Sequence, residues 1–191
     1  MFHVKRTEHL LDLLIRWNQR INLVAKADRD TLWQRHVVDS EQLLDLLPPG
    51  QTPAADLGSG GGFPGLVLAC LSDRPWHLVE VDRRKAAFLV AAAGEIGLPN
   101  VRVHVARIED VVLPPLGVLT ARALAPLGTL LGFAERLLAP DGVALFPKGR
   151  NAEAELTAAR PDWHMALERF PSRTDPDATI FRISGIRRAG P

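Results

Sequence analysis

The chain has 191 residues, a formal net charge of +1 at pH 7 and one cysteine. This length suits a single globular unit, which we expect to comprise an N-terminal helical extension over residues 1–50 and a larger domain over residues 51–191. One cysteine excludes an internal disulfide and a cysteine zinc site, and no apolar run approaches the ~20 residues of a membrane span. Since no signal peptide follows Met1, we expect a cytoplasmic protein. We also expect a monomer that holds no metal.

The first fifty residues predict two helices. Apolar side chains recur at helical spacing over residues 7–21, and a second helical stretch covers residues 29–47 before Pro48. Residues 1–36 carry seven basic and four acidic side chains, although the whole chain is almost neutral. The overall charge therefore does not indicate a nucleic-acid ligand, but the excess of basic residues near the N-terminus is compatible with one.

Strands and helices alternate from residue 53 onward, which predicts a doubly wound, mainly parallel, Rossmann-like α/β sheet. The last two strands lie too close together for a helical crossover and should form a terminal antiparallel hairpin. Ligands of such sheets bind beyond the carboxyl ends of the strands. The strands are expected at 54–58, 76–81, 101–105, 117–121, 142–147, 163–169 and 179–185, and the helices at 64–72, 83–96, 126–139 and 151–159.

A glycine-rich loop follows the first of these strands. Gly60, Gly62 and Gly65 match the dinucleotide pattern G-x-G-x-x-G, but that register needs a strand running into Gly60, and the residues before it form a poor strand. The alternative register, Asp56-x-Gly58-x-Gly60-x-Gly62, places the strand directly before the loop. It resembles motif I of the class I methyltransferases, which bind S-adenosylmethionine, and we favour it.

Two later segments could complete a cofactor site. Glu80 and Asp82 follow the second strand, and an ionised carboxylate there can accept hydrogen bonds from both ribose hydroxyls. We expect Glu80 to do so and Asp82 to cap the next helix. In the loop after the third strand, Ile108 could pack on the adenine and Glu109 could lie near its amine.

Two basic residues end the fourth and fifth strands. Arg122 interrupts an apolar run, and because burying an unpaired charge is costly it should meet a carboxylate, the cofactor or an RNA phosphate. Lys148 is either a substrate contact or a surface lysine. In the second helix, Arg35 and Asp39 are spaced for an ion pair, and His36 is either a ligand contact or a packed structural residue.

The absence of two motifs reduces the number of methyl-transfer reactions that the chain could catalyse. The chain has no tyrosine, so it lacks the Asn-Pro-Pro-Tyr motif common in methylation of exocyclic base amines. Cys70 falls inside the helix after the glycine loop, where it is badly placed as the nucleophile for carbon-5 pyrimidine methylation. Transfer to an oxygen, to a ring nitrogen or to a small molecule remains.

Several segments together resemble one family. They are Trp17-Asn18-x-x-Ile21-Asn22-Leu23, Arg35-His36-x-x-Asp39-Ser40, the glycine loop with Phe63-Pro64-Gly65, Thr120-Ala121-Arg122-Ala123, and Lys148-Gly149. In this order they resemble the bacterial small-subunit rRNA methyltransferase G family, also called glucose-inhibited division protein B, over residues 7 to 185. The resemblance implies S-adenosylmethionine-dependent methylation at N7 of one guanine in a decoding-region hairpin of 16S rRNA.

The resemblance and the motifs together define the expected site. Guanine N7 carries a free lone pair, so orientation replaces a general base; no residue is assigned as catalytic, and Arg122 and Lys148 are the candidates. The expected cofactor residues are Asp56, Gly58, Gly60, Gly62, Phe63, Glu80, Ile108, Glu109 and Arg122. The expected RNA-binding residues are Arg16, Arg20, Asn22, Lys26, Arg35, His36 and Lys148.

Other interpretations stay open at this point. The substrate could be free 16S rRNA or the 30S subunit, and the chain could instead methylate a small molecule or bind S-adenosylmethionine as a non-catalytic regulator. Val24, Gly117 and Ala121 depart from the residues usual in the family at these positions. These departures could weaken substrate contacts while leaving the cofactor site intact.

Overall fold

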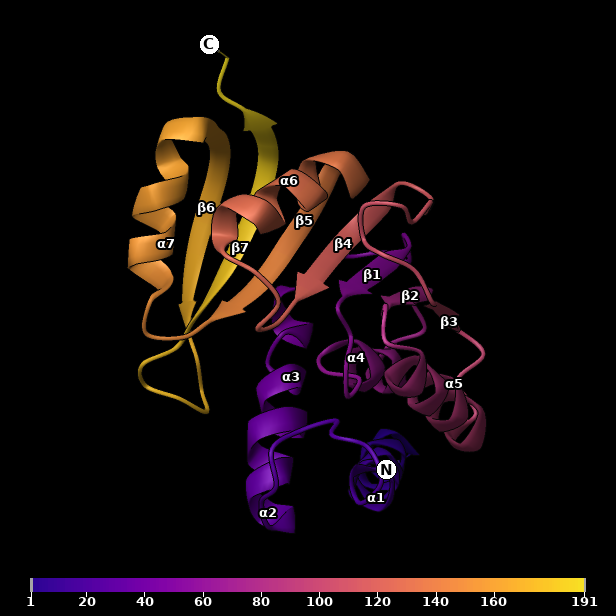
Figure 1. Ribbon diagram of the computed structural model, residues 1–191. Coiled ribbons are helices and arrows are strands. Elements are labelled where there is room, and N and C mark those ends of the chain that lie inside the picture. The colour runs from indigo at the N-terminus through magenta and orange to yellow at the C-terminus, as the bar shows by residue number, and fades with distance from the viewer. Residues whose placement is uncertain (1, 191) are drawn as a thin grey trace.

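A computed structural model describes residues 2–190 and contains one seven-stranded sheet in the order β3-β2-β1-β4-β5-β7-β6 (Figure 1). The first five strands are parallel, and β7 is antiparallel to both β5 and β6. The predicted α/β class and its terminal hairpin are confirmed. The strands are β1 Ala54–Leu57, β2 Trp76–Val79, β3 Val101–His104, β4 Leu116–Ala121, β5 Leu138–Lys148, β6 Trp163–Pro171 and β7 Thr179–Arg188.

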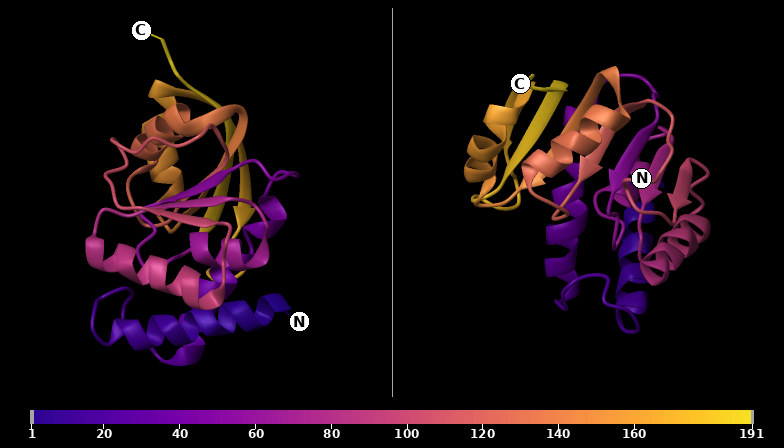
Figure 2. Two further views of the ribbon diagram at one scale, coloured as in Figure 1. Left: turned by 90° about the vertical axis from the view of Figure 1, so that its right-hand side faces the viewer. Right: turned by 45° about the horizontal axis from the view of Figure 1, so that its top comes forward.

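Helices cover both faces of the sheet (Figure 2). The N-terminal helices share one hydrophobic core with α4, α5 and one face of the strands, and α6 and α7 cover the other face. The division at residue 50 stays a prediction. The helices are α1 Phe2–Asn18, α2 Arg29–Leu32, α3 Asp39–Glu41, α4 Gly65–Leu71, α5 Arg83–Ile96, α6 Leu127–Leu137 and α7 Ala152–Ala159, with 3-10 turns at Leu44–Leu46 and Arg160–Asp162. Across residues 2–190, none of these helices combines the length and apolar character that crossing a membrane requires.

The second predicted helix, 29–47, is continuous only over residues 29–41, and a turn and a short 3-10 segment replace its predicted end. It is divided into α2, a π-helical turn Trp33–Val38, α3 and a 3-10 turn. Asp28 caps its start, where the carboxylate accepts hydrogen bonds from the backbone N–H and the hydroxyl of Thr31. The wider π-helical turn is a rare geometry that occurs mostly at functional sites. It contains two residues of the expected RNA-binding set, Arg35 and His36.

The first helix ends three residues earlier than predicted. Asn18 turns the chain after it: its side-chain oxygen accepts hydrogen bonds from the N–H groups of Leu23 and Val24, and its amide donates to the Val24 carbonyl. Trp17 packs edge-on against Phe88 with ring centroids 5.7 Å apart, which is a core contact.

The fifth strand is longer than predicted. It begins at Leu138, directly after α6, and a register shift between Leu116 and Val118 accommodates the extra residues. At Gly142, a Cβ would lie 2.6 Å from the Leu116 carbonyl oxygen, so only glycine fits this close approach. Local sequence pattern cannot show this pairing, because its partner lies on another strand.

A histidine pair on β2 and β3 makes the stability of the protein sensitive to acid. His77 Nδ1 lies 2.8 Å from His104 Nε2. Burial lowers the pKa of both rings, and the charge of Arg102 lowers both further. Because both pKa values fall below the usual 6.5, the unfolded chain binds more protons, and stability that is complete above pH 6.5 declines as the pH falls.

We therefore expect the melting temperature to fall between pH 7 and pH 5, by about 2–4 °C for each kcal/mol of stability removed. The variant His77→Gln/His104→Gln should show a smaller fall in thermal unfolding followed by circular dichroism. Replacing the exposed His164 with Gln serves as the control and should keep the full fall. An unchanged pH dependence in the double variant would show that the pair does not couple folding to protonation.

Candidate active site

The expected residues Gly58, Glu80, Arg122 and Lys148 lie at the carboxyl ends of the parallel strands β1, β2, β4 and β5, which Figure 1 shows side by side. There β1 runs directly into Gly58, which confirms the register that begins at Asp56. Gly58 and Gly60 have φ angles of +63° and +52°, a backbone region that favours glycine. A Cβ on Gly58 would meet the Leu124 side chain at 2.6 Å, whereas a Cβ on Gly60 would meet nothing closer than 3.7 Å. The loop therefore leaves open space beside Gly60.

Asp56 supports this loop from below. Its side chain is fully buried, and its two carboxylate oxygens accept hydrogen bonds from the Thr120 hydroxyl at 2.7 Å and the Gly65 N–H at 3.3 Å. Burial raises the pKa of Asp56 to about 6, against the opposing effect of the hydrogen bonds. Asp56 thus joins β1, β4 and the start of α4.

A cavity of about 380 Å³ lies beside the glycine loop. Five of the expected cofactor residues line it: Gly58, Gly60, Glu80, Ile108 and Glu109. Four others, Asp56, Gly62, Phe63 and Arg122, do not. The sequence interpretation missed Lys85 from α5 and Ala123 and Leu124 from the loop after β4. The glycine floor, the carboxylate and the apolar wall suit an adenosine group.

Glu80 closes one side of this cavity and is 7% exposed. One carboxylate oxygen accepts from the Gly60 N–H and the other from the Asp82 N–H, both at 2.8 Å. Each oxygen keeps a further lone pair for a ligand hydroxyl. Asp82 is the N-cap of α5, where it accepts from the N–H groups of Arg84 and Lys85, and these bonds lower its pKa. Asp82 therefore has the capping role expected of it, and the binding of ribose hydroxyls by Glu80 stays a prediction.

Arg136 supports the loop that contributes Ile108 to the cavity. This α6 residue donates to the carbonyls of Ile108 and Val111, and so holds the loop after β3 in place. Its position in the chain gives no local signal of this role, because the two elements meet only in the fold. The exposed Arg107–Glu109 pair, at 3.9 Å, contributes little to the same loop.

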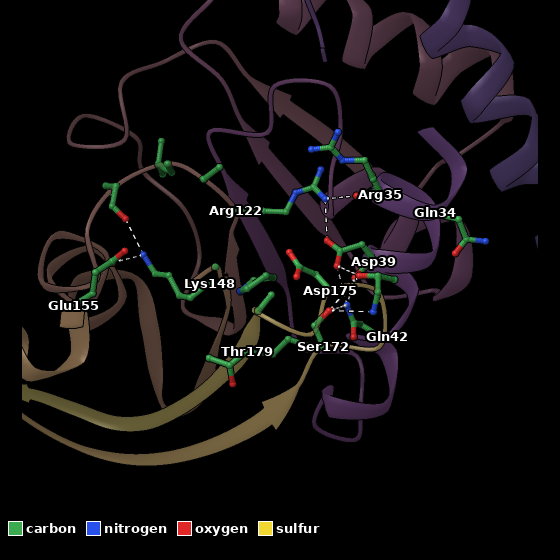
Figure 3. A pocket seen from close by; sticks show the side chains of 18 residues that line it. Gln34, Arg35, Asp39, Gln42, Arg122, Lys148, Glu155, Ser172, Asp175 and Thr179 are labelled. Carbon is green, nitrogen blue, oxygen red and sulfur yellow. Dashed lines mark hydrogen bonds and ion pairs between the residues drawn. The ribbon is translucent and has the colours of Figure 1, made fainter. Parts of the chain in front are cut away.

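A larger cavity of about 750 Å³ is lined in part by residues 122–125, which we call the β4 loop (Figure 3). Both cavities are lined by Ala123 and Leu124. Ala123 has a φ of +51°, a strained conformation for a residue with a Cβ, and such strain is concentrated at active sites. The β4 loop is therefore the only chain segment, among the described residues, that lines both cavities.

Arg122 connects the β4 loop to the N-terminal helices. Its guanidinium donates to the Asp39 carboxylate and the Arg35 carbonyl at 2.9 Å, and to His36 Nδ1 at 3.0 Å. The expected Arg35–Asp39 pair is wrong, because Asp39 is paired with Arg122. Of the three partners expected for Arg122, the carboxylate is the one observed.

His36 is a packed residue in this cluster. Its ring stacks on Phe63 with centroids 4.9 Å apart. Burial, together with the charges of Arg122 and Arg35, lowers its pKa to about 4. The imidazole is therefore neutral at physiological pH and accepts from Arg122 through Nδ1. Phe63 accordingly connects the glycine loop to the N-terminal helices.

Lys148 is also paired. Its ammonium donates to the Ala125 carbonyl at 2.9 Å and to Glu155 at 2.7 Å, and its side chain is 9% exposed. Figure 3 shows this pair on one side of the larger cavity and the Arg122–Asp39 cluster on the other. Lys148 thus borders the cavity, but its charge is already balanced.

The remaining expected RNA contacts divide into two groups. Arg16 pairs with Glu95 at 3.5 Å. Arg20, Lys26 and Arg35 have no carboxylate partner within residues 2–190. Arg84 of α5 donates to the Arg20 carbonyl at 3.0 Å, which brings Arg83, Arg84 and Lys85 beside the N-terminal helices. The sequence interpretation missed these three residues because they lie in a different part of the chain. No described group of three or more His, Cys, Asp or Glu residues is placed to hold a metal ion.

Comparison with known proteins identifies the family. The model of the family described as rRNA small subunit methyltransferase G matches residues 3–175. The chain belongs to this family. Ribosomal RNA small subunit methyltransferase G of Granulibacter bethesdensis is 55% identical over 92% of this chain and 82% of its own length. The protein of the same name from Gluconobacter oxydans is 50% identical over 96% of this chain and 94% of its own length.

Solved structures agree on the fold. A TehB-like SAM-dependent methyltransferase from Corynebacterium glutamicum aligns with a TM-score of 0.58 and 17% identity, over 76% of this chain and 86% of that one. A ribosomal protein L11 methylase from Lactobacillus delbrueckii subsp. bulgaricus aligns with a TM-score of 0.63 and 14% identity, over 87% of this chain and 82% of that one. The predicted family, the fold and S-adenosylmethionine as cofactor are thereby confirmed.

The structure shows where the three departures from the family pattern lie. A Cβ at position 117 would lie 1.8 Å from Thr52 Oγ1, and Arg74 donates to the same oxygen. Glycine therefore fits a tightly packed site at the amino edge of the sheet, far along β4 from Arg122. Val24 packs against the glycine loop, 3.2 Å from where a Cβ of Gly61 would be. Ala121 is buried in β4 next to Arg122.

We expect Gly60→Leu to abolish S-adenosylmethionine binding, because its side chain would extend into the open space beside the glycine loop. Gly97→Leu is the matched control: its φ is +74°, its Cβ would be unobstructed, and it lies at the far end of α5. Titration calorimetry should find binding only in the control, with both proteins folded by circular dichroism. Wild-type affinity in Gly60→Leu would exclude this cavity as the cofactor site.

Glu80→Ala should weaken cofactor affinity at least tenfold, since two charge-assisted bonds of ~1.5–3 kcal/mol each are removed, less whatever water replaces. Asp82→Ala removes a helix cap, so it should lower stability by about 0.5–2 kcal/mol and leave affinity within twofold. Calorimetry and urea unfolding of the two variants separate the effects. A larger loss of affinity in Asp82→Ala would reverse the assigned roles.

Proposed function

We propose that this protein transfers a methyl group from S-adenosylmethionine to N7 of a guanine in 16S rRNA, within the bacterial cytoplasm. One observation carries the proposal: the expected cofactor cavity and a larger cavity share Ala123 and Leu124 of the β4 loop in their linings. A donor and a base on opposite sides of this loop would be neighbours. Membership of the rRNA small subunit methyltransferase G family supports the choice of ribosomal RNA.

The residues at the larger cavity are suited to orientation. S-adenosylmethionine, when bound, supplies a methyl group on a sulfonium. Guanine N7 already has a free lone pair, so no residue has to remove a proton. His36 is held by Arg122 and Phe63, which leaves it no role as a base. Holding the base in line and excluding water can supply up to ~7–11 kcal/mol of the barrier.

Charge in the cavity also fits this reaction. Methylation at N7 makes the guanine ring cationic, and fixed negative groups would favour that change. Asp39, Glu155 and Asp175 all line the cavity (Figure 3). Arg122 and Lys148 balance the first two, while the carboxylate of Asp175 accepts only the Asp177 N–H among the described residues. Asp175 is therefore the carboxylate best able to face a ligand.

The direct test is to incubate the protein with radiolabelled S-adenosylmethionine and 30S subunits that lack the modification, and to map the labelled nucleotide. We expect label at N7 of one guanine in 16S rRNA, and none with Gly60→Leu. Parallel reactions with naked 16S rRNA identify the preferred substrate. Binding without transfer would support a regulatory role, and label only in small molecules would support the other alternative.

The RNA should follow the unpaired cations beside the cofactor cavity. We expect Arg20→Gln/Arg84→Gln to weaken 30S binding. The slope of log K against the logarithm of the salt concentration should become less steep by roughly 0.7–0.9 for each phosphate that the variant can no longer bind. Cofactor affinity should not change. Arg160→Gln/Arg187→Gln removes the same charge at the opposite edge of the sheet and should bind normally. Equal RNA affinity in both double variants would contradict this surface.

A further inference from the structure

The β4 loop is fixed at both ends. At its start, Arg122 is bonded to the N-terminal helices. At its end, the Ala125 carbonyl accepts from Lys148. Between these two anchors lies Ala123, with the strained φ of +51°. A residue persists in such a conformation only when its surroundings hold it there.

Lys148 and Glu155 form the second anchor. Glu155 accepts from Lys148 at 2.7 Å and from the Leu127 N–H at 2.8 Å, through the same carboxylate oxygen. The pair therefore connects the end of β5, the start of α6 and α7 to one carbonyl of the β4 loop. Figure 3 shows the Lys148 ammonium directed toward Glu155 and away from Arg122. Its contacts are those of a support for the loop.

We propose that Lys148 and Glu155 are positioning residues that hold the β4 loop between the two cavities, and thereby align the acceptor base with the methyl donor. This inference rests on the proposed function, since alignment matters only if both ligands meet at this loop. A misplacement of about 1 Å can slow such a reaction on the order of a hundredfold. The pair acts through Ala125 and needs no contact with the RNA.

The variant must remove the pair without leaving a buried charge. Replacing Lys148 alone would leave Glu155 partly buried and unpaired, which is strongly destabilising. Lys148→Met/Glu155→Met removes both charges and keeps similar volumes. The control is Glu153→Gln/Arg169→Gln, which breaks a second ion pair between α7 and a strand, at 2.8 Å on the exposed surface.

The first measurement is the backbone order parameter of Ala123 and Leu124 by NMR relaxation, which does not depend on activity. We expect wild type and control near ~0.85, and the Met/Met variant below ~0.6. The variant should remain folded by its dispersed amide spectrum. Unchanged order parameters would overturn the proposal, even if the protein methylates RNA.

The second measurement is the kinetics of methyl transfer to 30S subunits. We expect kcat of the Met/Met variant to fall roughly a hundredfold, with KM for 30S and the Kd for cofactor within threefold, and Lys148→Arg to recover most of the loss. A rise in KM with unchanged kcat would make the pair an RNA contact and overturn the proposal. Absence of transfer by wild type would contradict the proposed function, and the order parameters would then decide the role of the pair in the loop.

Discussion

The ion pair between Arg122 and Asp39 is the constraint on which the site depends. It joins two segments that are far apart in the chain, with both side chains about four-fifths buried. Arg122 also bonds the Arg35 carbonyl and His36, so four groups meet at the end of β4. Removing one partner of such a pair leaves an uncompensated charge. The position of the N-terminal helices and the start of the β4 loop are therefore determined together.

This arrangement explains why the family's motifs, scattered along the sequence, serve one site. The glycine loop is supported from below by Asp56 and from the side by Glu80, and Phe63 stacks on His36 at its far end. The β4 loop crosses between the two cavities. In the proposed function, the smaller cavity would hold the nucleoside part of the cofactor and the larger one would hold the acceptor base.

Local pattern was sufficient for the sheet, the terminal hairpin and the glycine loop, because alternation of strands and helices and the position of glycines depend on nearby residues. It also separated Glu80 from Asp82. It failed where the partner is distant. Asp39 is paired with a residue 83 positions away and not with its helical neighbour Arg35. Lys148 and Arg136 likewise have backbone partners that only the fold brings near.

The central claim is that donor and acceptor meet across the β4 loop. A crystal structure with S-adenosylhomocysteine bound tests it most directly. The account predicts the ribose at Glu80, the adenine near Ile108 and Glu109, and the sulfur beside Ala123 and open to the cavity lined by Arg122 and Lys148. A ligand seated in the larger cavity, or a sulfur directed away from the β4 loop, would contradict it.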